Sequence, residues 1–584
     1  MSAIERYYEE ELRYLYESGR EFARAHPDRA QFLNIDAVGD RDPYVERLFE
    51  GFAFLTARIR EKLDDGFPEL TEGLINLLWP HFLMEIPSLA IAEFRPRKGH
   101  LQETRILPKG SRLLSNPVGP DSVSCKFTTT YDIQLSPVSF MSIDKKTDTR
   151  KKGAIAFNFQ IEPGVKWQNL NLEPLRLYIH AETPTALAVH ELLTHHVVRA
   201  ELSFDNGREI IPLDPTRAVS AAGFKKDESL LPHDSRGFWG YTLLLEYFVF
   251  PEKFLFFDIN GLSAAPVLDP PPARFSINLY FDCDFPQDKP FGQEIFKLYC
   301  SPVVNLFKID TEPVVNTGRL TEYLVRADAS DSRSVVHSLI SVASVDRKSG
   351  ERFVYEPFYQ FRNIGKKNVR TYTSHYRQGF NGKRELSISV GGNQLDANSV
   401  LHEENLSIEA WCTNGVLPRD ELREGMISKP GVDFPDYVMF TNITRPTLPS
   451  APPPNEDYLW TFLSHLGATY ASFESAESLK TFLKLYEWSR SEGRGRRIDA
   501  ISDVKLQPAE MFHKGSIVRG IEFIISIEEK AFSDGDDMHL FGEVLRGFFA
   551  QYVSINSFLE LTLTARPSGA TMRWNSLKGA KWPV

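Results

Sequence analysis

The residues with the clearest potential for chemistry form one short motif, His-Glu-Leu-Leu-Thr-His-His, from His190 to His196. A zinc protease needs HExxH, because histidines at i and i+4 lie about 40° apart on one helical face. Position 194 is Thr, and His195 follows His190 at i+5, about 140° round a helix. The spacing favours histidines at a helix end or on the surface. The alternative is a multidomain metal-dependent hydrolase using His190, Glu191 and His195, which predicts bound zinc.

Three charged segments resemble ligand sites only in part. Residues 533–537, Ser-Asp-Gly-Asp-Asp, lack the alternating ligands and the terminal Glu of a calcium loop, so we expect a solvated turn. Residues 493–497, Gly-Arg-Gly-Arg-Arg, follow a predicted helix and lead into a predicted strand, the reverse of a phosphate-binding loop. We expect them in an exposed loop. The lysines between 145 and 152 are expected in a charged hairpin loop.

No other pattern predicts a reaction, since the chain has no GxSxG, Walker or GxGxxG motif. The cysteines are too widely spaced for a zinc site or a disulfide framework, and we expect reduced, packed thiols. The absence of these motifs argues against an enzyme but does not exclude catalysis, and we assign no residue to a catalytic, cofactor-binding or metal site. A β-rich carbohydrate-binding protein is a further hypothesis, weakened by the lack of an export signal. The four cysteines are Cys125, Cys283, Cys300 and Cys412.

Composition places the chain among globular proteins of several domains. It has 584 residues, of which 42% are hydrophobic and 25% charged, with a net charge of −11. The acidic balance argues against nucleic acid as a partner. The N-terminus is too charged for a secretory signal, and no run approaches the ~20 apolar residues that span a bilayer. A cytoplasmic location is expected.

The positioning elements begin with three predicted helices before residue 80. Residues 3–25 form an amphipathic helix, residues 43–64 a second, and the segment after Pro68 a third. In the second helix, apolar residues recur at steps of three and four, which puts them on one face. This stripe fits an ordinary core, or a helical bundle shared with a partner chain. Its residues are Val45, Leu48, Phe52, Leu55, Ile59 and Leu63.

After residue 88 the sequence pattern predicts short strands joined by Gly, Pro and Asn turns, followed by helices and strands near the C-terminus. Helices are predicted at 185–193, 240–250, 293–298 and 540–553, and a hairpin around Asp205-Asn206-Gly207. The fold class is α+β multidomain, with an N-terminal helical segment, β-rich middle domains and a C-terminal α+β domain. The predicted domains are 1–87, 88–268, 269–454 (ending in a Pro-rich linker) and 455–584.

Seven blocks of sequence, in order along the chain, resemble one protein family. The N-terminal block and the YVSINSF sequence within the last block are the most specific. The chain resembles the TssF family, a baseplate subunit of the bacterial type VI secretion system, although residues 95–170 match it only loosely. The blocks are 7–30, 42–88, 190–197, 240–262, 300–307, 355–361 and 540–561.

The resemblance implies a structural role with no enzymatic activity or cofactor. It implies a baseplate wedge that assembles with TssG, a second TssF copy and TssK around the VgrG spike hub, as the platform for tail tube and sheath. Contacts with TssE and with sheath or tube components are also expected. The subunit would be cytoplasmic and docked at the inner-membrane complex, touching the membrane only indirectly. The resemblance also favours a shared bundle, and the expected interface residues are Tyr8, Leu12, Leu15, Val45, Leu48, Phe52, Leu55, Ile59 and Leu63.

Overall fold

A computed structural model of the chain divides it into two compact units. The N-terminal unit comprises Met1–Leu78 with Pro453–Leu466, and the main unit comprises Trp79–Pro452 with Gly467–Val584. The structure describes residues 3–25, 43–64, 68–147, 152–205, 207, 209–232, 239–265, 271–286, 288–317, 320–327, 333–346, 350, 352–358, 370–378, 384–392, 404–453, 456–464, 470–489, 491–513 and 516–579.

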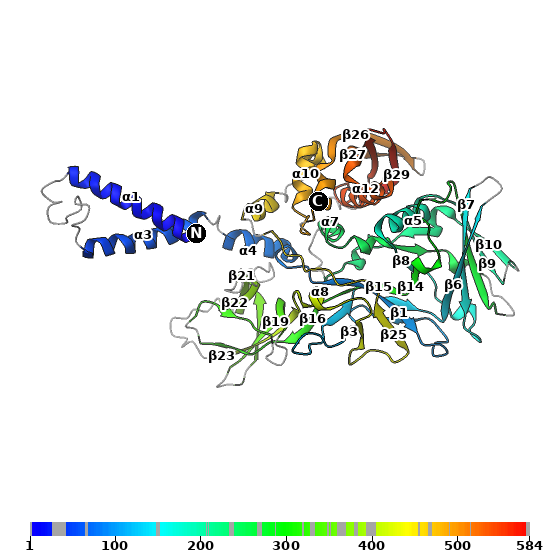
Figure 1. Ribbon diagram of the computed structural model, residues 1–584, viewed down its shortest axis with the longest axis horizontal. Coiled ribbons are helices and arrows are strands. Elements are labelled where there is room, and N and C mark those ends of the chain that lie inside the picture. The colour runs from blue at the N-terminus through cyan, green and yellow to red at the C-terminus, as the bar shows by residue number, and fades with distance from the viewer. Residues whose placement is uncertain are drawn as a thin grey trace. The chain divides into compact units, whose positions relative to one another are not determined.

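Helices make up the described part of the N-terminal unit (Figure 1). Helix α1 (Ala3–Ala25) packs against α3 (Pro43–Asp64), and α4 (Pro68–Leu78) packs against α9 (Glu456–Ser464). Pro43 and Pro68 each open a helix, where a missing N–H costs nothing. The three predicted N-terminal helices are therefore confirmed.

A six-stranded sheet, counted over the described residues, gathers strands from distant parts of the main unit. Its strand β1 lies between β15 and β25 and pairs antiparallel with both. The first six residues of β1 are all buried, as expected for an apolar run covered on both faces. In sheet order the strands are β24 (Ile427–Pro430), β3 (Arg112–Ser115), β4 (Lys126–Thr129), β15 (Cys300–Val304), β1 (Leu89–Pro96) and β25 (Val438–Asn442).

Helix α5 (Thr183–His195) packs on strands of two further sheets, and α7 (Trp239–Val249) precedes one of their strands in the chain. The predicted hairpin is confirmed, because β9 and β10 pair on either side of Asp205; Asn206 lies outside the described residues. One sheet has the order β10 (Glu209–Leu213), β9 (Val197–Phe204), β13 (Arg274–Phe281), β7 (Gly153–Ile161) and β6 (Val138–Thr147). The other has β11 (Val219–Ala221), β12 (Phe256–Ile259), β8 (Leu175–Ile179) and β14 (Phe296–Leu298), while β2 (Arg105–Leu107) and β5 (Ile133–Leu135) pair separately.

The segment from Phe307 to Thr413 builds an eight-stranded sheet, again counted over the described residues. Its own apolar core includes Val342, Ile388 and Ile408. The short helix α8 (Leu417–Glu421) follows it. The strands are β16 (Phe307–Asp310), β23 (Glu404–Thr413), β19 (Val335–Asp346), β20 (Arg352–Pro357), β21 (Arg370–Gln378), β22 (Arg384–Gly392) and β18 (Tyr323–Leu324), with β17 (Val314–Asn316) beside β23.

The C-terminal region contains a mixed sheet, with both antiparallel and parallel strand pairs, and α12 covers it (Figure 1). Strands β27 and β28 run parallel, and α12 forms the crossover that a parallel pair requires. Helix α12 also packs on α5 and α7. The elements are α10 (Ala476–Lys484), α11 (Glu492–Asp499), α12 (Gly535–Ala550), β26 (Ile501–His513), β27 (Ser516–Glu528), β28 (Phe558–Arg566) and β29 (Thr571–Lys578). Helix α6 (Pro215–Ala218) lies earlier in the chain and packs on β9.

The fold class is confirmed, but three local predictions need correction. Residues 493–497 lie in α11 rather than in an exposed loop. Residues 293–298 form one 3-10 turn, Gln293–Ile295, followed by β14 rather than a helical piece. Residues 533 and 534 precede α12 as the predicted turn requires, but residues 535–537 form the first turn of the helix, and Asp537 is buried. The hairpin predicted around the lysines is confirmed by β6 and β7, although residues 148–151 lie outside the described residues.

The four predicted domains divide the chain differently from the two compact units. The first unit ends at Leu78, and residues 269, 454 and 455, where later boundaries were predicted, lie outside the described residues. The four-domain division stays a prediction.

Candidate functional site

Four apolar side chains form an exposed face on α3. Leu48, Phe52, Leu55 and Ile59 are 60%, 58%, 60% and 61% exposed. At about 100° per residue, they lie within about 60° of one another around the helix axis. We refer to these four residues as the α3 face. A contiguous exposed apolar face of this kind marks an interaction site more often than scattered apolar residues do.

The seam between α1 and α3 uses other residues. Ala53 and Ala57 are fully buried, and the rings of Phe49 and Tyr16 lie 6.0 Å apart. On α3 these seam residues are centred about 130° from the α3 face. The helical hairpin therefore closes without using the α3 face. In the sequence, the spacing of Ala53 and Ala57 at i and i+4 is the signal for this seam, because small side chains let two helix backbones approach closely.

The remaining expected interface residues are placed less distinctly. Tyr8, Leu12 and Leu15 are half-buried on α1. Val45 and Leu63 lie within α3, but their side chains are outside the described residues. The structure thus brings Leu48, Phe52, Leu55 and Ile59 together on one free face, and the interface role of all nine residues stays a prediction.

The histidine motif lies in α5, and His190 occupies its interior. Its side chain is buried, which corrects the expectation of a helix-end or surface position. Burial lowers the pKa of His190 to about 4, despite a hydrogen bond to the backbone of Phe256. The neutral ring is a packed part of the interior because α5 is covered by sheet strands and by α12.

His195 and Glu191 turn to separate partners on α12. The ring of His195 lies 3.9 Å from that of His539, and burial lowers the pKa of His195 to about 3. Burial, followed by a hydrogen bond with the carboxyl group of Asp536, raises the pKa of Glu191 to about 9. Over the part of the chain that the structure describes, His190, Glu191 and His195 do not form a group that could share one metal ion. The geometry does not support the hydrolase alternative.

The basic segment has a structural role that the sequence did not reveal. In α11, Arg497 forms an ion pair with the buried Asp537 at 2.9 Å and donates to the hydroxyl of Tyr247 at 3.2 Å. Arg494 donates to the backbone carbonyl of Phe248. These long-range bonds hold a glycine-containing segment in a helix that its local sequence disfavours.

Within the described residues, no helix is both long and apolar enough to cross a bilayer.

Comparison with known proteins gives one consistent result. The sequence profile of the family described as "Type VI secretion system, TssF" matches residues 1–581. The chain is 28% identical over 624 aligned residues to type VI secretion system component TssF1 of Pseudomonas aeruginosa strain PAO1, covering 98% of each protein.

Solved structures show the same relationship over the fold. A chain of a type VI TssK–TssF–TssG baseplate subcomplex is 31% identical, with a TM-score of 0.76 over 92% of this chain and all of that one. A chain of a type VI baseplate complex is also 31% identical, with a TM-score of 0.64 over 99% of this chain and all of that one. The chain therefore belongs to the TssF family, structural and non-enzymatic components of the type VI secretion system baseplate.

Proposed function

We propose that the chain is a baseplate wedge subunit that binds a TssG-type partner through the α3 face and joins TssK in the same assembly. The similar solved chain comes from a TssK–TssF–TssG subcomplex, which supports this choice of partners. The observation that carries the proposal is the exposure of Leu48, Phe52, Leu55 and Ile59 on a helix whose seam with α1 is already filled.

The energetic argument follows from the exposed area. Fully burying a Leu, Ile or Phe side chain is favourable by about 1.5–3 kcal/mol relative to leaving it exposed. The α3 face offers four such side chains in one row, which is typical of the apolar core of an obligate interface. The half-buried Tyr8, Leu12 and Leu15 of α1 complete the proposed interface, together with Val45 and Leu63.

The wider assembly follows from the family role. A second copy of this chain, the VgrG spike hub, TssE and the sheath and tube components are its proposed further neighbours. In this arrangement the subunit acts in the cytoplasm and reaches the inner-membrane complex only through the assembled baseplate. Its proposed contribution is to hold these parts in position.

The test is co-purification of the tagged full-length chain with a co-expressed TssG-type subunit. We expect the double variant Phe52→Asp with Leu55→Asp to lose the partner, because two carboxylates would be buried without a counter-charge. Arg47→Asp is the matched control, since it places the same acidic residue at an exposed position outside the α3 face and should retain the partner.

Two readouts separate assembly from folding. Circular dichroism of the chain alone should not distinguish the double variant from the parent, because both positions are exposed there. Mass measurement by light scattering distinguishes pairing with the partner subunit from pairing with a second copy. Undiminished co-purification by the double variant would show that the α3 face is not the interface.

A further inference from the structure

The last residue of the histidine motif, His196, lies close to an aspartate and a cysteine in the main unit. One ligand atom each from His196, Asp282 and Cys283 lies within 4.8 Å of the other two. His196 Nδ1 and Asp282 Oδ1 are 2.7 Å apart. Side chains of His196 and Asp282 are 35% and 48% exposed, so the group is open to solvent ions. We call these three residues the His-Asp-Cys cluster.

Backbone pairing fixes this cluster. Strands β9 and β13 are antiparallel, and Val197 of β9 lies opposite Phe281 of β13. His196 precedes the one and Asp282 follows the other, so they become neighbours across the ladder, and the Asp282 N–H donates to the His196 carbonyl at 3.1 Å. One residue further, the Cys283 carbonyl accepts from Gly153 N–H at 3.1 Å at the start of β7. The three donors are carried by rigid paired backbone.

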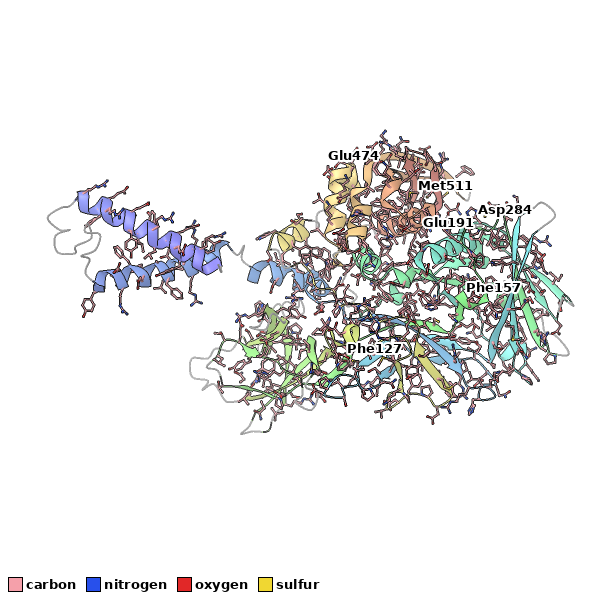
Figure 2. The ribbon with its side chains drawn as sticks, in the orientation of Figure 1. Phe127, Phe157, Glu191, Asp284, Glu474 and Met511 are labelled. Carbon is pink, nitrogen blue, oxygen red and sulfur yellow. The ribbon has the colours of Figure 1, made fainter. Side chains whose placement is uncertain are left out.

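Negative charge surrounds the cluster. Burial raises the pKa of the Cys283 thiol to about 11; the acidic groups of Asp282, Glu191 and Asp284 act in the same direction, and Lys152 acts in the opposite direction. Glu191 Oε1 lies 4.0 Å from His196 Nε2. Figure 2 labels Glu191 and Asp284 in the same part of the main unit. Acidic side chains therefore predominate beside the cluster, which favours a cation over an anion as its ligand.

We propose that His196, Asp282 and Cys283 form a binding site for a divalent transition-metal ion of the zinc class, with a water molecule as the fourth donor. Thiolate, imidazole and carboxylate are the donors that zinc takes in tetrahedral sites, whereas magnesium and calcium take oxygen donors alone. Two donors on one zinc ion lie about 3–4 Å apart, so small side-chain rotations complete the site from the observed separations. Binding exchanges the Cys283 S–H bond for a metal–sulfur bond and releases that proton to solvent.

A metal ion bound at this site would link elements that are far apart in the sequence. His196 follows the end of α5, and Asp282 and Cys283 follow β13. It differs from the hydrolase alternative because it uses neither His190 nor His195, and because the pairing of β9 with β13, rather than helical spacing alone, brings its residues together.

The experiment titrates the purified full-length chain with Co²⁺ and reads the near-ultraviolet thiolate-to-cobalt charge-transfer band, then displaces Co²⁺ with Zn²⁺. We expect a saturable band that Zn²⁺ removes. Cys283→Ser should abolish the band, and His196→Ala should weaken binding by at least about tenfold. Cys412→Ala and His100→Ala are the matched controls, since these residues lie outside the cluster, and both should bind as the parent does.

A second readout keeps the test informative if a variant folds poorly. Zn²⁺ should raise the Tm of the parent by mass action and leave that of Asp282→Asn, a conservative change at a half-exposed position, nearly unchanged. Absence of a charge-transfer band in the parent would overturn the proposal. So would a band that survives Cys283→Ser, or equal weak binding by all variants. None of these outcomes depends on the TssG-type partner, so they leave the proposed function untouched.

Discussion

Helices α3 and α7 both carry dense apolar sequence, yet they are used in different ways. In α7 every residue from Trp239 to Val249 is buried, even Glu246. In α3 the apolar row of Leu48, Phe52, Leu55 and Ile59 is exposed, while two alanines and Phe49 face α1. An apolar row on a helix therefore indicates a face that favours burial, but it does not indicate whether residues of the same chain or of another chain bury it.

The ion pairs of the two regions also differ in their exposure to solvent. Near α3, the ion pair of Arg60 with Glu10 joins side chains that are 45% and 48% exposed. Beside α7, Lys253 and Glu246 form an ion pair whose side chains are 0% and 3% exposed. The main unit therefore has an interior that depends on a buried ion pair, whereas the ion pair of Arg60 with Glu10 and the apolar row on α3 are exposed.

The largest expected effect comes from breaking the buried pair. Glu246→Ala leaves Lys253 buried without its carboxylate and also removes the acceptor of the Ser229 hydroxyl and the Leu230 N–H. We expect a loss of about 3–5 kcal/mol in the free energy of unfolding. Urea unfolding followed by tryptophan fluorescence measures it, since Trp239 lies 5.2 Å from the Lys253 ammonium.

Its control is a surface ion pair in the same unit. Asp121→Ala removes the partner of Arg333, 2.7 Å away, where both side chains are about half exposed. The expected loss is below about 1 kcal/mol. Equal losses for Glu246→Ala and Asp121→Ala would contradict the description of the main unit as an interior dependent on its buried pairs.

The next effect tests packing at α12. A Cβ added at Gly542 would lie 2.2 Å from Cη2 of Trp574 and 2.8 Å from a methyl carbon of Leu563. Although alanine favours a helix, we expect Gly542→Ala to destabilise the main unit by about 1–3 kcal/mol through overpacking. Thermal unfolding checks this, and a raised Tm would show that the contact between α12 and β29 relaxes easily.

A pH-dependent effect of about 2 kcal/mol is expected from His337 in β19. Burial lowers its pKa to about 4 from an ordinary value of 6.5, although its Nε2 hydrogen-bonds the Glu85 carbonyl at 2.6 Å. Between these two pKa values the unfolded chain binds more protons than the folded one, so stability falls as pH falls. At about pH 5 the contribution lost is about 2 kcal/mol.

The measurement compares the parent with His337→Gln from neutral pH down to about pH 4. The variant should lose Tm less steeply than the parent, because glutamine can keep a polar contact without titrating. Parallel Tm curves would show that the folded protein accommodates the charged ring. The N-terminal unit offers no equivalent, since its described helices carry no histidine.

The smallest effect is expected in α3. A Cβ at Gly51 meets nothing within 4 Å, in contrast to Gly542. Gly51→Ala should therefore stabilise α3 by about 0.5–1 kcal/mol. Hydrogen exchange of α3 amides in the full chain should slow correspondingly, and unchanged or faster exchange would contradict the exposed geometry of this helix.

Much of the fold could be predicted from local sequence. The period of 3.6 located α1, α3 and α4, and the Asn-Gly turn located the hairpin of β9 and β10. The wrong predictions concern segments whose structure depends on contacts with residues distant in the sequence. The local sequence of α11 predicts a loop. The segment is helical because Arg497 contacts Asp537 and Tyr247, which are too distant in the sequence for a local pattern to reveal.

The sequence by itself determined the apolar row on α3, the family and the absence of known catalytic motifs, because periodicity and motif spacing are local properties of the chain. Only the tertiary structure decided which side of α3 remains exposed, that His190 is buried, and that His196 lies beside Asp282 and Cys283. Residues 196 and 282 are 86 positions apart, and their contact exists because strands β9 and β13 pair antiparallel. Burial and proximity depend on such long-range pairing, which residue spacing along one helix or strand does not encode.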